Sequence, residues 1–411
     1  MRRRTFVSLL GVSALGLLGA RYWPDEGFLN PCSDGELPRE LAGHELMQRI
    51  WQDLDAAQLW DSHVHVVGAG DSDSGIHLDP RMRSVLHPAH NLRFRFYVNA
   101  ACADPQAGID ATAWQGLSRL AAAFPTGARF LMLAFDAWHD ENGRRDLART
   151  AFYIPNDYVR FLAARQPARF GWIASVHPWR EDAVEALRAQ ARAGAVAIKW
   201  LPQIQNIDPA SPKCDAFYAA LAEMRMPLLV HAGHEYAVAG VANQELGHPL
   251  RLRRPLEHGV RVIVAHCATE GHGPDLDRGS HGPQRPNFDY FARLMDEARF
   301  EDRLYGDISA ITQINRLGRP LQTLLEREDW HHRLVNGSDY PLPGVMPLFS
   351  MRALVAKNYL DAAAADFLRR LRQYNVLLFD FAHKRLLRYR GHRFAPRVFE
   401  SGRILARRAR A

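Results

Sequence analysis

Eight short hydrophobic runs, each ending in polar residues, recur between residues 59 and 339. Patterns typical of amphipathic helices separate them, such as residues 181–194. The runs are 59–66, 129–135, 170–177, 195–201, 227–233, 261–267, 303–309 and 333–339. Strands that alternate with helices predict a parallel sheet. Eight such units fit a closed (β/α)8 TIM barrel, and an open doubly wound sheet is the weaker alternative.

The segments around these runs suggest the domain boundaries. We expect an export signal at 1–20, an irregular and helical extension at 21–56, the barrel at 57–390 and a basic, solvated C-terminal tail at 391–411. A helical insertion fills 68–128, a Gly/Pro-rich loop fills 270–286, and further helices occupy 346–390. The insertion and the loop both follow strands, on the side where barrels carry their active sites, so both are candidate lids.

Residues 1–20 combine an arginine-rich start, an apolar stretch and small residues, the pattern of an export signal. Arg3 and Arg4, followed by Thr5, Phe6 and Val7, resemble a twin-arginine signal, which directs the export of folded proteins. The apolar stretch falls short of the ~20 residues of a comfortable membrane span. We expect a periplasmic or exported protein with no membrane span in the mature chain. An ordinary export signal and an uncleaved anchor are the alternatives.

The charge distribution argues against a nucleic-acid partner. The net charge is +7, but the excess of arginine over acidic residues lies at the two ends of the chain, and the sequence between them is near balance. No stripe of basic and aromatic residues crosses the predicted fold. We expect a small-molecule substrate and leave a homo-oligomer open.

Four cysteines, Cys32, Cys102, Cys214 and Cys267, lack zinc-finger spacing. In an oxidising compartment they allow one or two disulfides, whose pairing the sequence does not reveal. Cys267 follows a histidine at the end of a run, and we expect it to be a small buried hydrophobic residue.

Polar side chains stand where the predicted strands end. His63 and His65 are two residues apart on the first strand, so they point to the same face. The later strands end in His177, Lys199, His231, His266, Asp307 and Asp339. Burying so many polar groups in one barrel mouth is costly unless something pairs with them. A zinc-type ion would do so, with imidazole nitrogens and a carboxylate oxygen as ligands.

These motifs, in this order, resemble the metal-dependent amidohydrolase superfamily, in its amidohydrolase-related branch. The resemblance rests on DSHVH (61–65), IKW (198–200), LLVHAG (228–233), IVAHC (263–267), NGSDYP (336–341) and the closing helix QYNVLLFDFAHKRLL (373–387). It implies the barrel fold, a zinc ion, and hydrolysis of an amide, ester or lactone by a metal-activated water. Some members of the branch decarboxylate or hydrate small carboxylic acids instead, and that is the alternative function.

The resemblance also implies roles for individual residues. His63, His65, His231 and Asp339 match metal ligands, and Asp339 also matches the general base that takes the proton of the attacking water. His266 matches either a ligand of a second metal or a catalytic histidine that polarises the attacked carbonyl.

Lys199 bears on the number of metal ions. Members with two metals carry a carboxylated lysine at the end of the fourth strand, and lysine is rare in this chain, where Lys199, Lys213, Lys357 and Lys384 stand among 52 basic residues. Members with one metal carry a lysine in a similar IK-x-x-P segment without using it as a ligand. We favour one divalent ion and leave a second, with carboxylated Lys199, open.

Residues just past the strand ends are candidates for substrate binding. They are Arg180, Trp200, His234, Glu235 and Tyr340. Arg180 would meet a substrate carboxylate, as a decarboxylase requires. We also expect Asp307 to orient a ligand histidine and His177 to lie near the metal. A catalytically silent binding barrel is a further alternative.

Overall fold

The computed structural model describes residues 26–33, 36–238 and 241–406. The export signal predicted at 1–20 lies outside the described residues. No helix in the described part of the chain is long and apolar enough to cross a membrane.

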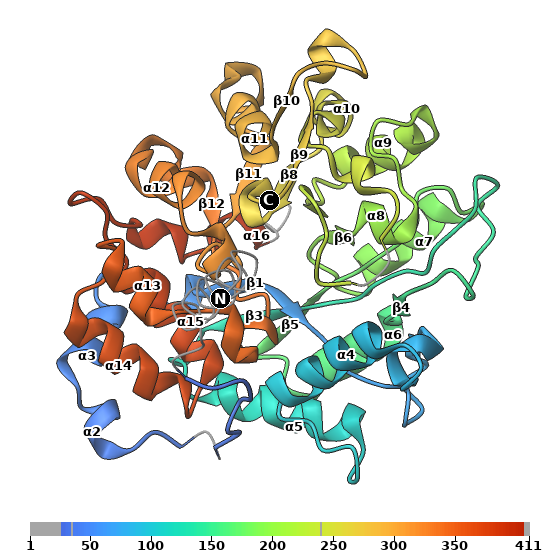
Figure 1. Ribbon diagram of the computed structural model, residues 1–411. Helices are drawn as coiled ribbons and strands as arrows, with labels where there is room; N and C mark the ends of the chain where they lie inside the picture. Colours follow the sequence, from blue (N-terminus) through green and yellow to red (C-terminus); the bar gives the residue numbers. More distant parts are fainter. Residues whose placement is uncertain (1–25, 34–35, 239–240, 407–411) are drawn as a thin grey trace, which may run out of the picture.

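Eight parallel strands in the described residues form the centre of the molecule (Figure 1). They are β1 (Trp60–His65), β3 (Arg129–Leu133), β5 (Phe170–Ile173), β6 (Ile198–Trp200), β7 (Leu228–His231), β8 (Val262–Ala265), β11 (Leu304–Asp307) and β12 (Leu334–Val335). They pair in the orders β1-β3-β5 and β6-β7-β8-β11-β12. Each coincides with one of the eight predicted hydrophobic runs.

Two parallel bridges join these groups into one closed barrel. Ala174, which follows β5, pairs with Ile198 of β6, and Val64 of β1 pairs with Tyr340 beyond β12. At the second joint the backbone N–H of Asp339 donates to the carbonyl of His63 at 2.8 Å. The predicted (β/α)8 barrel is therefore confirmed, and the open sheet is excluded.

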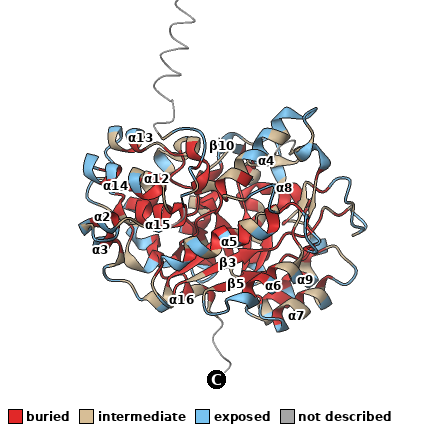
Figure 2. Cartoon of the chain, turned by 90° about the horizontal axis from the view of Figure 1, so that it is seen from below, coloured by how far each residue is buried: buried red, intermediate tan, exposed pale blue. Residues whose placement is uncertain are grey.

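Helices surround the barrel, and burial decreases outward (Figure 2). They are α5 (Ile109–Ala122), α6 (Asn156–Arg165), α7 (Ala183–Arg192), α9 (Asp215–Glu223), α10 (Arg253–Glu257), α11 (Asn287–Asp296) and α12 (Arg319–Glu326). In α12 the buried residues are Leu321, Leu324 and Leu325. This i, i+3, i+4 spacing makes one apolar face that packs on the strands.

The insertion after β1 is an ordered structure. Its first loop folds around Asp110, whose carboxylate accepts hydrogen bonds from the hydroxyls of Ser72 (2.7 Å) and Ser74 (2.6 Å). A short strand, β2 (His77–Leu78), then pairs with β4 (Phe152–Tyr153), and the helix α4 (Pro88–Ala100) follows.

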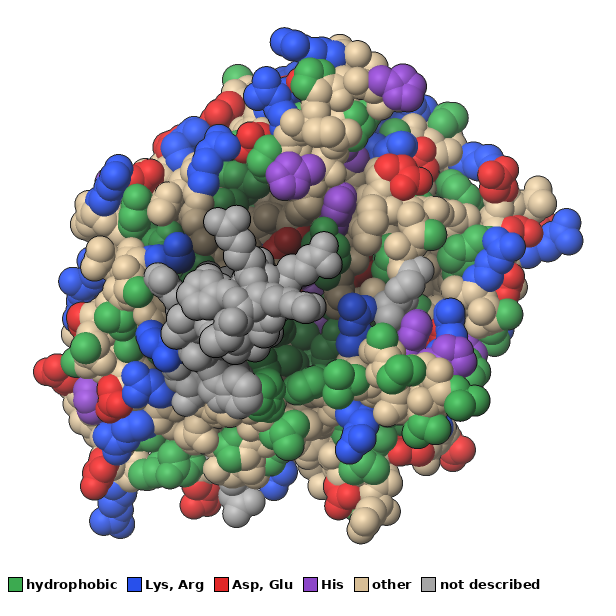
Figure 3. Space-filling model, in the orientation of Figure 1, with side chains coloured by type: hydrophobic (Ala, Val, Ile, Leu, Met, Phe, Trp, Pro, Cys, Tyr) green, Lys and Arg blue, Asp and Glu red, His purple; other side chains and the backbone are tan. Residues whose placement is uncertain are grey.

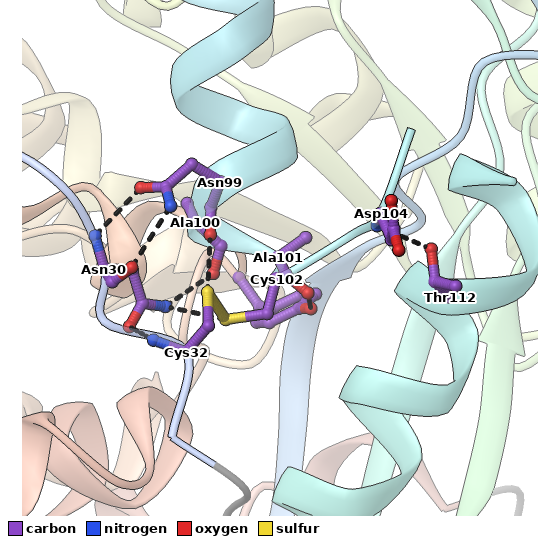
Figure 4. The surroundings of a disulfide bond; sticks show 9 residues. Asn30, Cys32, Asn99, Ala100, Ala101, Cys102, Asp104 and Thr112 are labelled. Carbon is purple, nitrogen blue, oxygen red and sulfur yellow. Dashed lines mark hydrogen bonds between the residues drawn. A yellow bond between two sulfur atoms is a disulfide. The ribbon is translucent and has the colours of Figure 1, made fainter. Parts of the chain in front are cut away.

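One disulfide, Cys32–Cys102, ties the N-terminal segment to the end of α4 (Figure 4). Beside it the side-chain amide of Asn99 accepts a hydrogen bond from the backbone N–H of Asn30 and donates one to the carbonyl of the same residue. Cys214 and Cys267 are free and buried. The structure thus supplies the pairing that the sequence left undetermined, and Cys267 is buried as predicted.

The helices of the C-terminal part pack against α5 of the insertion and against the N-terminal extension. Three helices, α13 (Met351–Ala356), α14 (Ala362–Arg372) and α15 (Val376–Leu386), pack together, and α3 (Glu45–Trp51) of the N-terminal extension contacts α15. The segment after residue 390 was expected to be solvated, but Phe394, Val398, Phe399 and Leu405 are buried. The arginines of this segment alternate with apolar residues that pack under the strands, through α16 (Gly402–Leu405).

Candidate active site

Three predicted ligand residues meet at one end of the barrel. His65 Nε2 lies 3.0 Å and His63 Nε2 lies 3.4 Å from Asp339 Oδ1. The two histidines come from β1, and Asp339 comes from the turn after β12, where its φ of 59° is left-handed. Non-glycine residues hold such a backbone only when their surroundings enforce it, which is common at functional sites. The three residues offer one ligand atom each within 4.8 Å of one another.

Asp307 at the end of β11 orients His63. Its Oδ2 lies 2.7 Å from His63 Nδ1, and both side chains are fully buried. A carboxylate partner keeps the proton on Nδ1 and leaves the lone pair of Nε2 facing the site. Gly337 is needed next to this pair, because a Cβ there would lie 2.6 Å from His63 Cβ and 2.7 Å from Asp307 Oδ1.

Ser309 links His266 to the same carboxylate. Ser309 Oγ donates to Asp307 Oδ2 at 2.5 Å and lies 2.8 Å from His266 Nδ1. Since the hydroxyl proton goes to Asp307, His266 Nδ1–H is the donor to Ser309, and His266 Nε2 is left as an acceptor. Three consecutive left-handed residues, from His266 to Ala268, follow β8 and turn the ring, which stacks on His63 at 5.1 Å.

His231 at the end of β7 has a carboxylate partner of its own. Glu235 Oε2 lies 3.5 Å from His231 Nδ1, and Glu235 is fixed by the backbone N–H of Ala237. His231 Nε2 is buried and, within the described residues, has no hydrogen-bond partner. A buried polar atom without a partner needs a ligand, a water or an ion.

Burial sets the protonation of this cluster. It lowers the pKa of His63 to about 4, helped by the charge of Lys199, and it lowers the pKa of His231 and His266 well below the usual value. Burial raises the pKa of Asp339, but the neighbouring histidines outweigh this effect and bring it well below the usual value. Neutral imidazoles and an ionised carboxylate are the forms in which these side chains bind a metal.

Lys199 stands within this cluster. Its Nζ lies 3.3 Å from His63 Nε2, and the side chain is 1% exposed. Burial lowers the pKa of Lys199 to about 8, although three nearby carboxylates act in the opposite direction. It is therefore the cation nearest to the ligand atoms.

These residues form the floor of a cavity of about 480 Å3. Figure 3 shows it as a hollow in the centre of the face, with hydrophobic side chains along part of its rim. We call six of the lining residues the floor: His63, His65, Lys199, His231, His266 and Asp339. The helix α4 and residues 341–348 supply much of the remaining wall, so the insertion does cover the site. The loop 270–286, the other candidate lid, does not line the cavity; Arg293 pairs with its Asp275 at 3.0 Å.

The predicted substrate residues divide into two groups. His234 and Glu235 line the cavity, although Glu235 is occupied by His231. Arg180 pairs with Asp136 and Asp182 and does not line it.

The two aromatic candidates also lie outside the lining. Trp200 is fully buried and donates to the carbonyl of Val176, and Tyr340 points to the carbonyl of Ala101. His177 likewise bonds the carbonyl of Gln205, away from the cavity. Side chains next to a strand-end ligand alternate between the two faces of the strand, and these point into the surrounding packing.

Sequence reasoning missed Arg316, which follows β11. It lines the cavity with a side chain that is 10% exposed, and its Nη1 donates to Thr269 Oγ1 at 2.6 Å. Its nearest carboxylate, Glu270, is 3.7 Å from Nε. Its charge lowers the pKa of His231 and of His266, and the charge of Asp339 in turn acts to raise the pKa of Arg316. Its position in a loop after a strand was the available signal, but an arginine is too common in this chain to stand out.

A family model described as amidohydrolase (Amidohydro_2) matches residues 60–371, which includes every floor residue. The chain belongs to the amidohydrolase family. A comparison with curated proteins finds no match.

Several solved structures are similar to this amidohydrolase at low identity. A TIM-barrel protein from Bordetella bronchiseptica is 12% identical, with a TM-score of 0.45, over 76% of this chain and 99% of that one. A probable 2-pyrone-4,6-dicarboxylic acid hydrolase from Acinetobacter baumannii is 15% identical, with a TM-score of 0.43, over 73% and 90%. A 5-carboxyvanillate decarboxylase from Sphingomonas paucimobilis is 13% identical, with a TM-score of 0.42, over 77% and 95%. Likeness at this level carries no argument about the reaction.

The floor fits a divalent metal ion. In the described residues two groups offer close ligand atoms: His63, His65 and Asp339, and His63, His266 and Asp307. The second group competes with the hydrogen bond between His63 Nδ1 and Asp307, while the first leaves that bond intact. The unpartnered Nε2 of His231 lies in the same cavity as the first group.

Proposed function

We propose that this amidohydrolase is a metal-dependent hydrolase that cleaves an amide, ester or lactone bond of a small molecule. The observation that carries the proposal is the convergence of His63 Nε2, His65 Nε2 and Asp339 Oδ1 on the floor of the cavity. We further propose that it acts after export to the periplasm, as the predicted signal implies.

We propose that His63, His65, His231 and Asp339 hold one ion, with zinc as the first candidate. When bound, such an ion would make a water molecule acidic enough to attack at neutral pH and would polarise the scissile carbonyl. The hydrogen bond from His63 Nδ1 to Asp307 supports one ion over two, because it directs a single nitrogen of His63 to the site. Lys199 then acts as an unmodified amine.

Asp339 is the proposed general base. Its Oδ1 faces His63 and His65, whereas its Oδ2 lies 3.9 Å from His266 Nδ1, beyond hydrogen-bonding distance. Oδ2 is thus the oxygen that remains to accept the proton of an attacking water.

His266 and Lys199 have complementary proposed roles. The Ser309 contact leaves His266 Nε2 as an acceptor, so a neutral His266 would take a proton or bind an ion rather than donate to the carbonyl. Donation to the developing oxyanion falls to Lys199, whose Nζ stands beside the ligand atoms, 3.3 Å from His63 Nε2.

A metal-dependent decarboxylase or hydratase of a small carboxylic acid is the second candidate, and Arg316 favours it. A largely buried guanidinium beside the floor, with its nearest carboxylate 3.7 Å away, can bind a substrate carboxylate. Arg316 replaces Arg180 in this role, since Arg180 is paired elsewhere.

Purified protein should be stripped of metal, reloaded with zinc, and assayed against a panel of esters, lactones, amides and aromatic carboxylic acids. Hydrolysis that needs zinc, and that His65→Ala abolishes, would support the proposal. Release of CO2 without hydrolysis would favour the decarboxylase. No zinc-dependent turnover of any kind would contradict both.

A further inference from the structure

Part of the cavity wall is apolar and largely aromatic. Six of its side chains define what we call the apolar compartment: Phe94, Phe96, Phe135, Phe152, Leu342 and Leu348. We propose that this compartment binds a bulky hydrophobic group of the substrate, so that the enzyme acts on esters, lactones or amides of medium-chain or aromatic acids. This inference rests on the proposed hydrolase function for its chemistry, but not for the binding itself.

The compartment and the floor belong to one cavity. His65 stacks on Phe135 at 5.3 Å with the two rings 4° from parallel, so an aromatic side chain of the compartment touches a proposed ligand. Phe135 in turn contacts Phe152 edge to face at 4.9 Å. A substrate with its scissile bond at the floor would therefore place its neighbouring atoms against these rings.

The compartment is built in advance of any ligand. Gly344, between Leu342 and Leu348, approaches α4 so closely that a Cβ would lie 2.3 Å from the carbonyl oxygen of Ala100. Tyr97 of α4 donates to the carbonyl of Ala237 at 2.6 Å, and the disulfide at Cys102 holds the end of the same helix. Pockets that are preformed lose little binding energy to reorganisation.

A small polar substrate would leave most of the apolar surface of the compartment exposed to water. Apolar surface gains by leaving water in proportion to the area covered, and a small ligand would cover little of it. A cavity of about 480 Å3 lies in the size range that accommodates drug-sized molecules. Lys199 and Asp339 are at the floor and Glu235 and Arg316 lie next to it, so most of the charge in the lining fixes one end of the ligand and leaves the other to apolar contacts. Arg93 of α4 is the charged lining residue next to the compartment.

A binding experiment tests the compartment without catalysis. The neutral fluorophore N-phenyl-1-naphthylamine should bind saturably to metal-free protein and to the Asp339→Asn variant, and 1-decanol should displace it at far lower concentration than 1-butanol. Phe94→Ala and Phe152→Ala should each weaken binding about tenfold, whereas Phe161→Ala, on an exposed phenylalanine outside the cavity, should not. Absence of saturable binding, or equal displacement by both alcohols, would overturn the proposal.

A kinetic experiment tests whether the compartment binds the acyl group of a substrate during hydrolysis. For 4-nitrophenyl esters from acetate to decanoate, kcat/KM of the zinc-loaded enzyme should rise about fourfold per added methylene, the factor expected for a buried CH2. Phe94→Ala should flatten this rise, whereas Phe161→Ala, outside the cavity, should leave the whole series as in the wild type. A flat series in the wild type would overturn the substrate class. Probe binding without hydrolysis of any ester would instead refute the hydrolase function and leave the compartment standing.

Discussion

The floor and the apolar compartment differ in what they are built from. The floor stands on the ends of the barrel strands, where Asp307 and Ser309 join His63 and His266 in one hydrogen-bonded group. The compartment stands largely on the inserted helix α4 and on residues 342–348, which are held by a disulfide and by close backbone packing. We infer that the barrel determines the reaction and that the added segments determine which molecules undergo it.

The largest expected effect concerns the floor. Asp339→Asn should reduce turnover by about 10^3-fold, because it removes the base and a ligand charge at once. Asp275→Asn removes a buried carboxylate outside the cavity and is the control. It should retain turnover, which would show that the loss of a buried carboxylate does not by itself abolish activity. Steady-state kinetics and thermal melting measure both. An Asp339→Asn variant with full activity would refute the assigned base.

The disulfide should matter for the compartment and not for the floor. Replacing Cys32 and Cys102 by serine opens a link that spans 70 residues, and in the chain-entropy model this lowers the free energy of unfolding by about 4 kcal/mol. Denaturant titration measures the loss. Zinc affinity of the folded variant should stay within about twofold of the wild type. A large loss of zinc affinity would show that the two regions are not separate.

The orientation of His63 should tune the metal. Asp307→Asn should weaken zinc binding by about 10- to 100-fold, since the carboxylate holds the ring with its free nitrogen towards the site. Competition with a chelator provides the measurement. Ser309→Ala should weaken zinc binding less, because it leaves the contact between Asp307 and His63 in place. Equal affinity in the wild type and in Asp307→Asn would contradict this role.

The smallest expected effect tests the close approach of residues 342–348 to α4. Gly344→Ala places a methyl group 2.3 Å from the carbonyl oxygen of Ala100, so α4 and residues 342–348 have to move apart until a normal contact distance is restored. We expect a roughly threefold to tenfold lower kcat/KM for the decanoate ester and no change for the acetate ester, on the scale of ~1 kcal/mol. Gly318→Ala, where a Cβ would meet nothing within 4 Å, is the control. Equal losses on both esters would place the damage at the floor.

The barrel and the floor were predictable because their physics is periodic and local. Alternation along β1 places His63 and His65 on one face. The other floor residues stand at or just past the ends of hydrophobic runs, where the sequence changes from apolar to polar: Lys199, His231, His266 and Asp339. The compartment was not predictable, because it depends on where α4 docks. No local pattern indicates that Phe94 and Phe152, far apart in sequence, share one cavity.

Three candidates for substrate binding do not line the cavity, and the reason is the same for each. Arg180, Trp200 and Tyr340 follow strand ends, as the true cavity residues do, but each has a stronger partner elsewhere: two aspartates for Arg180 and backbone carbonyls for the other two. Arg316 was missed because its neighbours in space, Thr269 and Glu270, come from another loop. Side-chain partners across loops cannot be inferred from one-dimensional spacing.

The most direct test of the account is the location of the metal by anomalous diffraction at the zinc absorption edge in crystals of the zinc-loaded protein. We expect one peak, within bonding distance of His63 Nε2, His65 Nε2, His231 Nε2 and Asp339, with Lys199 unmodified. Two peaks bridged by a carboxylated Lys199 would contradict the single-metal site, and a peak away from the floor or no peak at all would contradict the account as a whole.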